Sequence, residues 1–146
     1  SVTGVQTCAL PISQALPSGA PSEQLAFAMG LLNQNDYAGG ERAFKEFLAQ
    51  HPTDPLAGSA QYWLGRTYFA RNNFNEAVRT FAEGYKKYPQ SQRAPENLLY
   101  LGRSLAALNQ KNNACQSFAR MLSEYPKASD ATKAGAQAER KKLACS

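Results

Sequence analysis

The chain has 146 residues, of which 43% are hydrophobic and 18% charged, a composition typical of a single globular domain. The formal net charge is +5, yet the basic residues are dispersed apart from Lys86-Lys87 and Arg140-Lys141-Lys142. This dispersion favours a solvated surface over a nucleic-acid interface, and we expect no nucleic-acid partner. No apolar run approaches the roughly 18 to 20 residues of a membrane-spanning helix, so we expect no membrane insertion.

The first twelve residues differ in character from the rest. They carry no charge and contain an isolated cysteine, Cys8. They lack the basic start and the apolar run of a secretory signal peptide. Residues 2–12, VTGVQTCALPI, resemble the forward translation of a sequencing-library adapter. We therefore predict that residues 1–12 are an artefactual segment fused to a gene fragment, the alternative being a genuine flexible arm. Residues 13–22 are expected to be a linker remnant, and residues 23–146 the folded domain.

A repeat of 37 residues organises the domain. Pro52, Pro89 and Pro126 are spaced by 37 residues (52 to 89 and 89 to 126), and each follows a tyrosine or histidine. YWLGRTY at 62–68 aligns with LYLGRSL at 99–105 on the same period. A period of this length predicts stacked helical hairpins. We expect three units, at about 21–54, 58–91 and 95–128.

Each unit is predicted to contain two helices separated by a turn. In the second unit, Tyr62 and Phe69 lie at the two ends of one apolar stripe with helical spacing, and a second stripe runs from Phe74 to Tyr85. The proline then ends the second helix, because it has no N–H to donate to the helix. The turns are expected at the asparagine-containing pairs Asn35-Asp36, Asn72-Asn73 and Asn112-Asn113. The small residues Gly65 and Gly102 should let the paired helices approach closely.

Residues 129–144, SDATKAGAQAERKKLA, predict a C-terminal capping helix. Ser129 or Asp130 can cap its first turn, and the basic residues 140–142 complement the helix dipole in its last turn. A single hairpin cannot bury its own apolar stripe, so stacking must supply the core. The expected fold is therefore all-α: three hairpins stacked in a right-handed solenoid and closed by this cap.

The pattern resembles the tetratricopeptide repeat, whose motif places Leu-Gly-x-x-Tyr on the first helix and Ala-x-x-x-Phe on the second, before a proline. The second unit carries this motif at Leu64, Gly65, Tyr68, Ala77, Phe81 and Pro89. The 37-residue unit, APENLLYLG at 94–102, NNACQSF at 112–118 and a basic tail ending in cysteine resemble one group more narrowly. That group is the C-terminal domain of the YbgF/CpoB family.

The narrower resemblance implies a non-enzymatic periplasmic adaptor. It would coordinate Tol–Pal-driven constriction of the outer membrane with septal peptidoglycan synthesis in cell division. The implied partners are TolA and a bifunctional peptidoglycan synthase. Members of the family usually carry an N-terminal trimerising coiled coil, which is absent here, so we expect this chain to be monomeric. The alternative is a generic peptide-binding scaffold in envelope assembly or secretion.

Two cysteines remain when Cys8 is set aside, Cys115 and Cys145. The capping helix should fold back along the helix that contains Cys115, which brings residues near 140 opposite it. The match with Cys145 is approximate, but we predict a disulfide that closes a loop of about 30 residues. Two unrelated thiols are the alternative.

Catalytic chemistry is not indicated by the residues available. His51 is the only histidine and precedes Pro52 at a helix end, where it is expected to cap or pack. Without a second histidine, a histidine-rich metal site cannot form. We expect no catalytic residue, no metal and no cofactor.

A protein-binding groove is expected on the first helices of the units, which line the concave face in repeats of this kind. Its candidate residues are those that packing in the core is not expected to use up: Leu25, Met29, Asn33, Tyr62, Arg66, Phe69, Leu99, Arg103 and Ala106. Arg66 and Arg103 are one period apart, so stacking should place them on adjacent helices. Two arginines among apolar side chains suit an acidic segment with apolar anchors. The alternative is that both arginines pair with neighbouring helices or with water.

Overall fold

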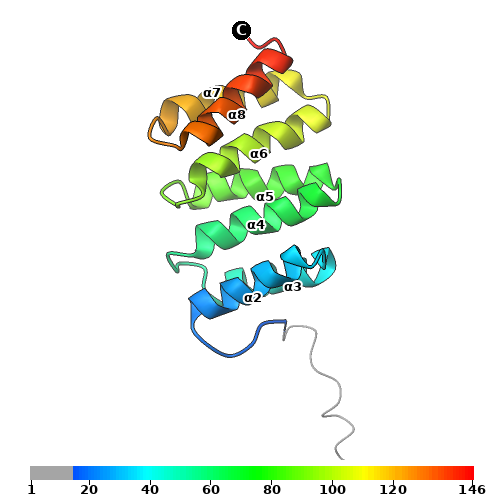
Figure 1. Ribbon diagram of the computed structural model, residues 1–146, viewed down its shortest axis with the longest axis vertical. Coiled ribbons are helices and arrows are strands. Elements are labelled where there is room, and N and C mark those ends of the chain that lie inside the picture. Colours follow the sequence, from blue (N-terminus) through cyan, green and yellow to red (C-terminus); the bar gives the residue numbers. More distant parts are fainter. Residues whose placement is uncertain (1–14) are drawn as a thin grey trace, which may run out of the picture.

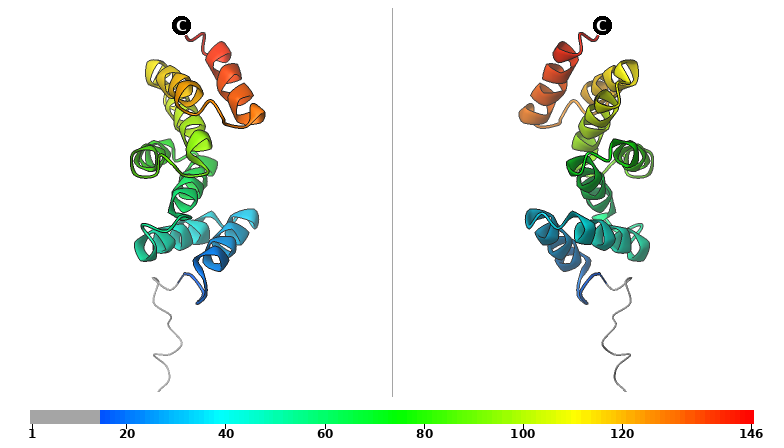
Figure 2. Two further views of the ribbon diagram at one scale, coloured as in Figure 1. Left: turned by 90° about the vertical axis from the view of Figure 1, so that its left-hand side faces the viewer. Right: turned by 90° about the vertical axis from the view of Figure 1, so that its right-hand side faces the viewer.

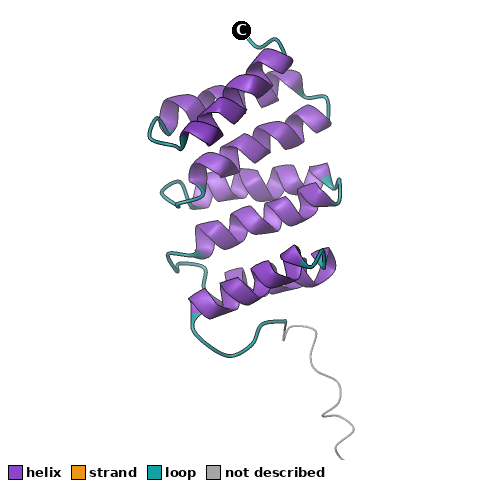
Figure 3. Ribbon diagram, in the orientation of Figure 1, coloured by secondary structure: helices purple, strands orange, loops and turns teal. Residues whose placement is uncertain are grey.

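The computed structural model describes residues 15–146, in which all regular structure is helical (Figures 1 and 3). The predicted artefactual segment 1–12 lies outside the described residues. The helices are α2 (Pro21–Asn33), α3 (Tyr37–Gln50), α4 (Ala57–Ala70), α5 (Phe74–Lys87), α6 (Ala94–Ala107), α7 (Lys111–Glu124) and α8 (Asp130–Lys142). None of these helices is long and apolar enough to cross a membrane.

The hairpins form a two-layer solenoid, which confirms the expected all-α architecture. Helices α2, α4, α6 and α8 make one layer, and α3, α5 and α7 make the other (Figure 2). The end helices α2 and α8 project to the same side, so the first layer lines the inner side of a curve. We call the surface of this layer the inner face.

The turn within each hairpin is built on one asparagine with positive φ. Asn35, Asn72 and Asn109 have φ of 62°, 59° and 61°, in the left-handed region that asparagine adopts more readily than most residues. The predicted turn at Asn112-Asn113 is wrong, because both residues lie in the first turn of α7. The backbone reverses three residues earlier, where the 37-residue period places the left-handed residue.

The tyrosine-proline pairs tie each unit to the one before it. The hydroxyl of Tyr88 donates to the carbonyl of Pro52 at 2.9 Å, and that of Tyr125 donates to the carbonyl of Pro89 at 2.8 Å. His51 occupies the same position in the first unit. It is the C-cap residue of α3 and shares a 2.8 Å side-chain hydrogen bond with Gln24. Successive units are therefore joined by hydrogen bonds that repeat every 37 residues, as well as by the apolar core.

One fully buried phenylalanine recurs with the 37-residue period, as Phe44, Phe81 and Phe118, and the first unit buries Phe47 as well. Two of these rings lie against a glycine on the partner helix. A Cβ atom on Gly65 would lie 2.6 Å from Cδ1 of Phe81, and one on Gly102 would lie 2.7 Å from Cδ1 of Phe118. These distances confirm that the small residues permit the close approach of the paired helices.

The cap α8 begins as predicted. The Ser129 hydroxyl accepts a 3.1 Å hydrogen bond from the backbone N–H of Thr132, and basic residues occupy the last turn. Its packing is sparse, since Thr132 and Ala136 are its only buried residues. Beyond its C-terminal end, Cys145 lies against Cys115 of α7 with a Cα–Cα distance of 5.7 Å, a separation typical of bridged cysteines.

Candidate protein-binding face

The nine predicted groove residues divide by burial. Leu25, Tyr62 and Leu99 retain only 8%, 2% and 5% of their surface, so the expectation that they lie outside the core is wrong. The Tyr62 ring lies against Tyr100 of α6, and Leu99 lies beside Gly135 of α8. Five others are half-buried on the inner-layer helices: Met29, Arg66, Phe69, Arg103 and Ala106. Asn33 is exposed at the end of α2.

Aromatic rings from α4 and α6 meet at the centre of this layer. The Tyr62 ring packs edge-on against Trp63 at 4.9 Å and against Tyr100 at 6.0 Å between centroids. The Phe69 ring meets Tyr100 at 5.3 Å and at right angles. The sequence prediction did not include Trp63 and Tyr100. An aromatic pair one period apart, at 63 and 100, was the signal that could have identified them.

Arg66 lies on this aromatic cluster. Its guanidinium carbon is 4.1 Å from the centroid of the Tyr100 ring and 5.4 Å from that of Trp63. Its Nη1 donates to the Tyr62 hydroxyl at 2.7 Å. Burial raises the pKa of the Tyr62 hydroxyl against the opposing effect of the Arg66 charge, so this phenol stays neutral and can accept the hydrogen bond at physiological pH. Within residues 15–146, no carboxylate forms an ion pair with Arg66.

A second guanidinium approaches the same indole ring. Arg93, the N-cap residue of α6, places its guanidinium carbon 5.2 Å from the centroid of Trp63. Its nearest carboxylate is that of Glu96, at 4.0 Å, which is the limit of an ion pair. Two cations thus flank one ring with little compensating negative charge. Arg93 was missed from the sequence because it lies in a loop before the helix rather than on the predicted stripe.

Arg103 differs from its period equivalent Arg66. Its Nε donates to Glu139 of α8 at 2.7 Å, and its guanidinium carbon lies 4.8 Å from the Tyr100 centroid. Arg103 therefore pairs with a neighbouring helix, as the alternative expects, whereas Arg66 stacks on Tyr100 and forms no ion pair within residues 15–146. On the inner face, Arg66 and Arg93 are therefore the arginines whose positive charge remains available to a ligand.

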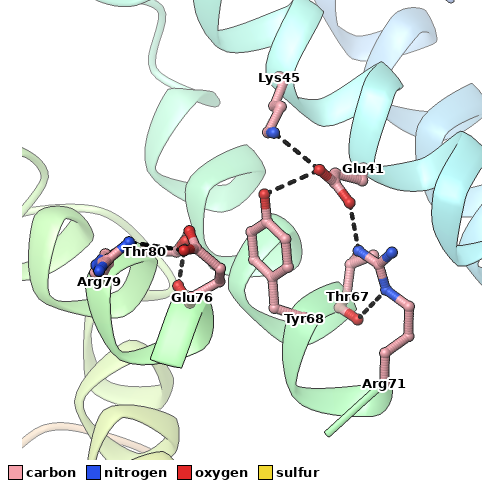
Figure 4. Close-up of polar contacts among 8 residues, drawn as sticks. All are labelled: Glu41, Lys45, Thr67, Tyr68, Arg71, Glu76, Arg79 and Thr80. Atoms are coloured by element: carbon pink, nitrogen blue, oxygen red, sulfur yellow. Dashed lines mark hydrogen bonds and ion pairs between the residues drawn. The ribbon is translucent and has the colours of Figure 1, made fainter. Parts of the chain in front are cut away.

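A contrasting polar cluster joins α3 and α4 (Figure 4). Glu41 accepts hydrogen bonds from Lys45 at 2.8 Å and from the Tyr68 hydroxyl at 3.1 Å, and it forms an ion pair with Arg71. Partial burial acts to raise the pKa of Glu41, but the hydrogen bonds from these three side chains outweigh it and lower the pKa to about 2. The negative charge of Glu41 is therefore neutralised by partners within the fold, so the cluster stabilises the contact between α3 and α4 and is not a ligand site.

Recesses within the described residues include one of about 640 Å³ beside residues 15–18 and one of about 510 Å³ between the loops at 89–92 and 126–129. Neither is lined by Arg66 or Tyr100. Small-molecule sites are concave and enclosed, whereas a helical face that carries cations and aromatic rings suits a protein segment. In the described part of the chain, histidine, cysteine and acidic side chains form no group of three that could hold a metal.

Comparisons with known proteins agree with this architecture. Tetratricopeptide-repeat profiles match residues 25–92 and 96–128. Two curated sequences of the cell division coordinator CpoB, both from Pseudomonas putida, are 34% identical to the chain over 65 residues. The match covers 43% of this chain and 24% of each relative, so the chain spans about a quarter of the length of these relatives.

A solved structure has the same fold. The crystal structure of the Sgt2 TPR domain from Aspergillus fumigatus superposes with a TM-score of 0.70, covering 90% of this chain and 83% of that chain at 14% sequence identity. At this level of identity the likeness concerns the fold alone.

Proposed function

Because the chain belongs to the tetratricopeptide-repeat family, we propose that it is a non-enzymatic scaffold whose inner face binds an acidic segment of a partner protein. The observation that carries the proposal is the state of Arg66, which stacks on Tyr100 at 4.1 Å and has no carboxylate partner among residues 15–146. A guanidinium held rigidly on rings forms charge-assisted hydrogen bonds to a carboxylate at low entropic cost. Half-buried Phe69 and Met29 would receive apolar side chains of the same segment.

The biological setting that we propose comes from the similarity to CpoB, whose name describes a cell division coordinator. The chain would act in the periplasm and coordinate Tol–Pal-driven constriction with septal peptidoglycan synthesis, with TolA and a bifunctional peptidoglycan synthase as partners. An oxidising compartment would keep Cys115 and Cys145 bridged. The second candidate is a peptide-binding scaffold in envelope assembly or secretion. Adjacency of the gene to tol and pal genes would favour the first.

The test compares two charge reversals on opposite layers of the solenoid. Arg66→Glu should weaken binding to the periplasmic part of TolA by tenfold or more, because it removes a central arginine anchor. Arg79→Glu is the control, since Arg79 lies on α5 with 75% of its side chain exposed. Both variants should keep the helical circular dichroism of the wild type. Equal calorimetric affinities for wild type and Arg66→Glu would exclude the inner face as the binding site.

A further inference from the structure

The last helix covers part of the proposed binding face. Helix α8 lies over α6 at the end of the inner layer (Figures 1 and 2), where a fourth unit would place its first helix. Its Gly135 approaches α6 closely, because a Cβ atom there would lie 3.4 Å from both Leu99 Cδ2 and Arg103 Nη2. Two of the residues predicted for the groove are thus covered by a helix of the chain itself.

Glu139 of α8 supplies Arg103 with a carboxylate. Only 28% of the Arg103 side chain and 20% of the Glu139 side chain are exposed, so the 2.7 Å pair is well shielded from water. One period before Glu139 is Gly102, which has no side chain and leaves Arg66 without such a partner. Glu139 therefore forms with Arg103 the kind of ion pair that we propose a partner's carboxylate forms with Arg66.

The packing that holds α8 in this position is weak. Its buried residues are a threonine and an alanine, Thr132 and Ala136. The hydroxyl of Thr132 is 3.5 Å from Glu96, a long contact. Because α8 buries so little apolar surface, its contact with the domain is stabilised less than the contacts between the other helices, which bury phenylalanine rings. The strongest restraint is at its far end, where Cys145 meets Cys115 of α7.

We infer that α8 is a displaceable lid on the binding face, held by the Cys115–Cys145 bridge, and that Glu139 competes with the partner's carboxylate for Arg103. This inference rests on the proposed function, because it concerns access to the same face. A dithiol reductant supplies two electrons and two protons, leaves Cys115 and Cys145 as thiols and becomes a disulfide itself. Release of the lid then exposes Leu99 and frees Arg103 beside Arg66.

The experiment uses a fluorescent synthetic peptide of alternating glutamate and leucine as the probe. Mass spectrometry of non-reduced, alkylated protein first establishes that the bridge is present, and alkylation of both cysteines would overturn the inference at once. Cys145→Ser then removes the bridge without changing any charge. It should bind the probe about three- to tenfold more tightly and show faster amide exchange across α8. Wild-type protein reduced with dithiothreitol should behave in the same way, so the test does not depend on the variant.

Two charge variants separate the lid from general electrostatics. Glu139→Gln should also tighten binding of the probe, whereas Glu83→Gln, which removes an exposed charge on α5, should leave it unchanged. Unchanged affinity in Cys145→Ser and in reduced wild type would overturn the inference, whatever happens to the exchange rates. Failure of the proposed function has a different signature, in which Arg66→Glu binds the probe as tightly as wild type does in every redox state.

Discussion

At the scale of single residues, the glycines on α4 and α6 determine how closely each hairpin can pack. Gly65 and Gly102 face fully buried phenylalanine rings at distances that no Cβ atom tolerates. Neither ring can move easily, because it is enclosed by the neighbouring helices. A methyl group at these positions would therefore destabilise the domain by overpacking the core.

Gly102→Ala should destabilise the domain by about 1–3 kcal/mol, since the new methyl group overlaps the Phe118 ring. Gly30→Ala is the matched control, because Gly30 also lies within a helix but a methyl group there would meet no atom within 4 Å. It should stabilise the domain by about 0.5–1 kcal/mol through helix propensity. Urea unfolding followed by circular dichroism measures both, and equal midpoints for the two variants would contradict the account.

Residues of the candidate site were only partly predictable from the sequence. The period placed Arg66 and Arg103 on adjacent helices, and the structure agrees. It could not distinguish their environments, because Glu139 belongs to the cap, which does not repeat the motif. Burial of Leu99 also escaped the pattern, since it depends on how far each first helix is covered by the next one.

At the scale of the elements, the apolar stripes and the prolines predicted every helix pair, while the turns were harder to locate. Asparagine pairs mark the turn in the second unit, but in the third unit the pair Asn112-Asn113 lies inside α7. The backbone requirement is a single residue at positive φ, which is Asn109. A sequence search for asparagine pairs cannot reveal which asparagine adopts that conformation, whereas strict use of the 37-residue period can.

Asn109→Ala should therefore destabilise the domain by about 1 kcal/mol, because alanine is strained in the left-handed region. Asn109→Gly should be close to neutral, since glycine adopts this conformation without a steric penalty. Asn112→Ala, which changes an exposed residue in the first turn of α7, should cause no loss of stability. Thermal unfolding compares the three variants, and greater damage from Asn112→Ala than from Asn109→Ala would show that the turn does not depend on Asn109.

At the scale of the whole molecule, stability depends on the contacts between successive units, as in other solenoids. The contact between the first and second units includes the Glu41 cluster (Figure 4), which has no counterpart at the next junction, where position 78 is a valine. Among residues 15–146, the first unit also has the most exposed large hydrophobic residue, Phe27, at the position of the buried Leu64 and Leu101. The Glu41 cluster therefore gives this junction a polar contact that the next junction lacks.

Glu41→Gln should weaken the domain in a pH-dependent way. The pKa of Glu41 falls from 4.5 to about 2 on folding, so its contribution is present above about pH 4.5 and is lost as the pH falls toward 2. With 24% of the carboxyl side chain exposed, we expect a loss of about 2–3 kcal/mol at pH 7. The wild type and the variant should converge in stability near pH 2. Urea unfolding at pH 7, 4 and 2.5 measures this difference, and a constant gap across the three values would show that the carboxylate charge is not what joins the two units.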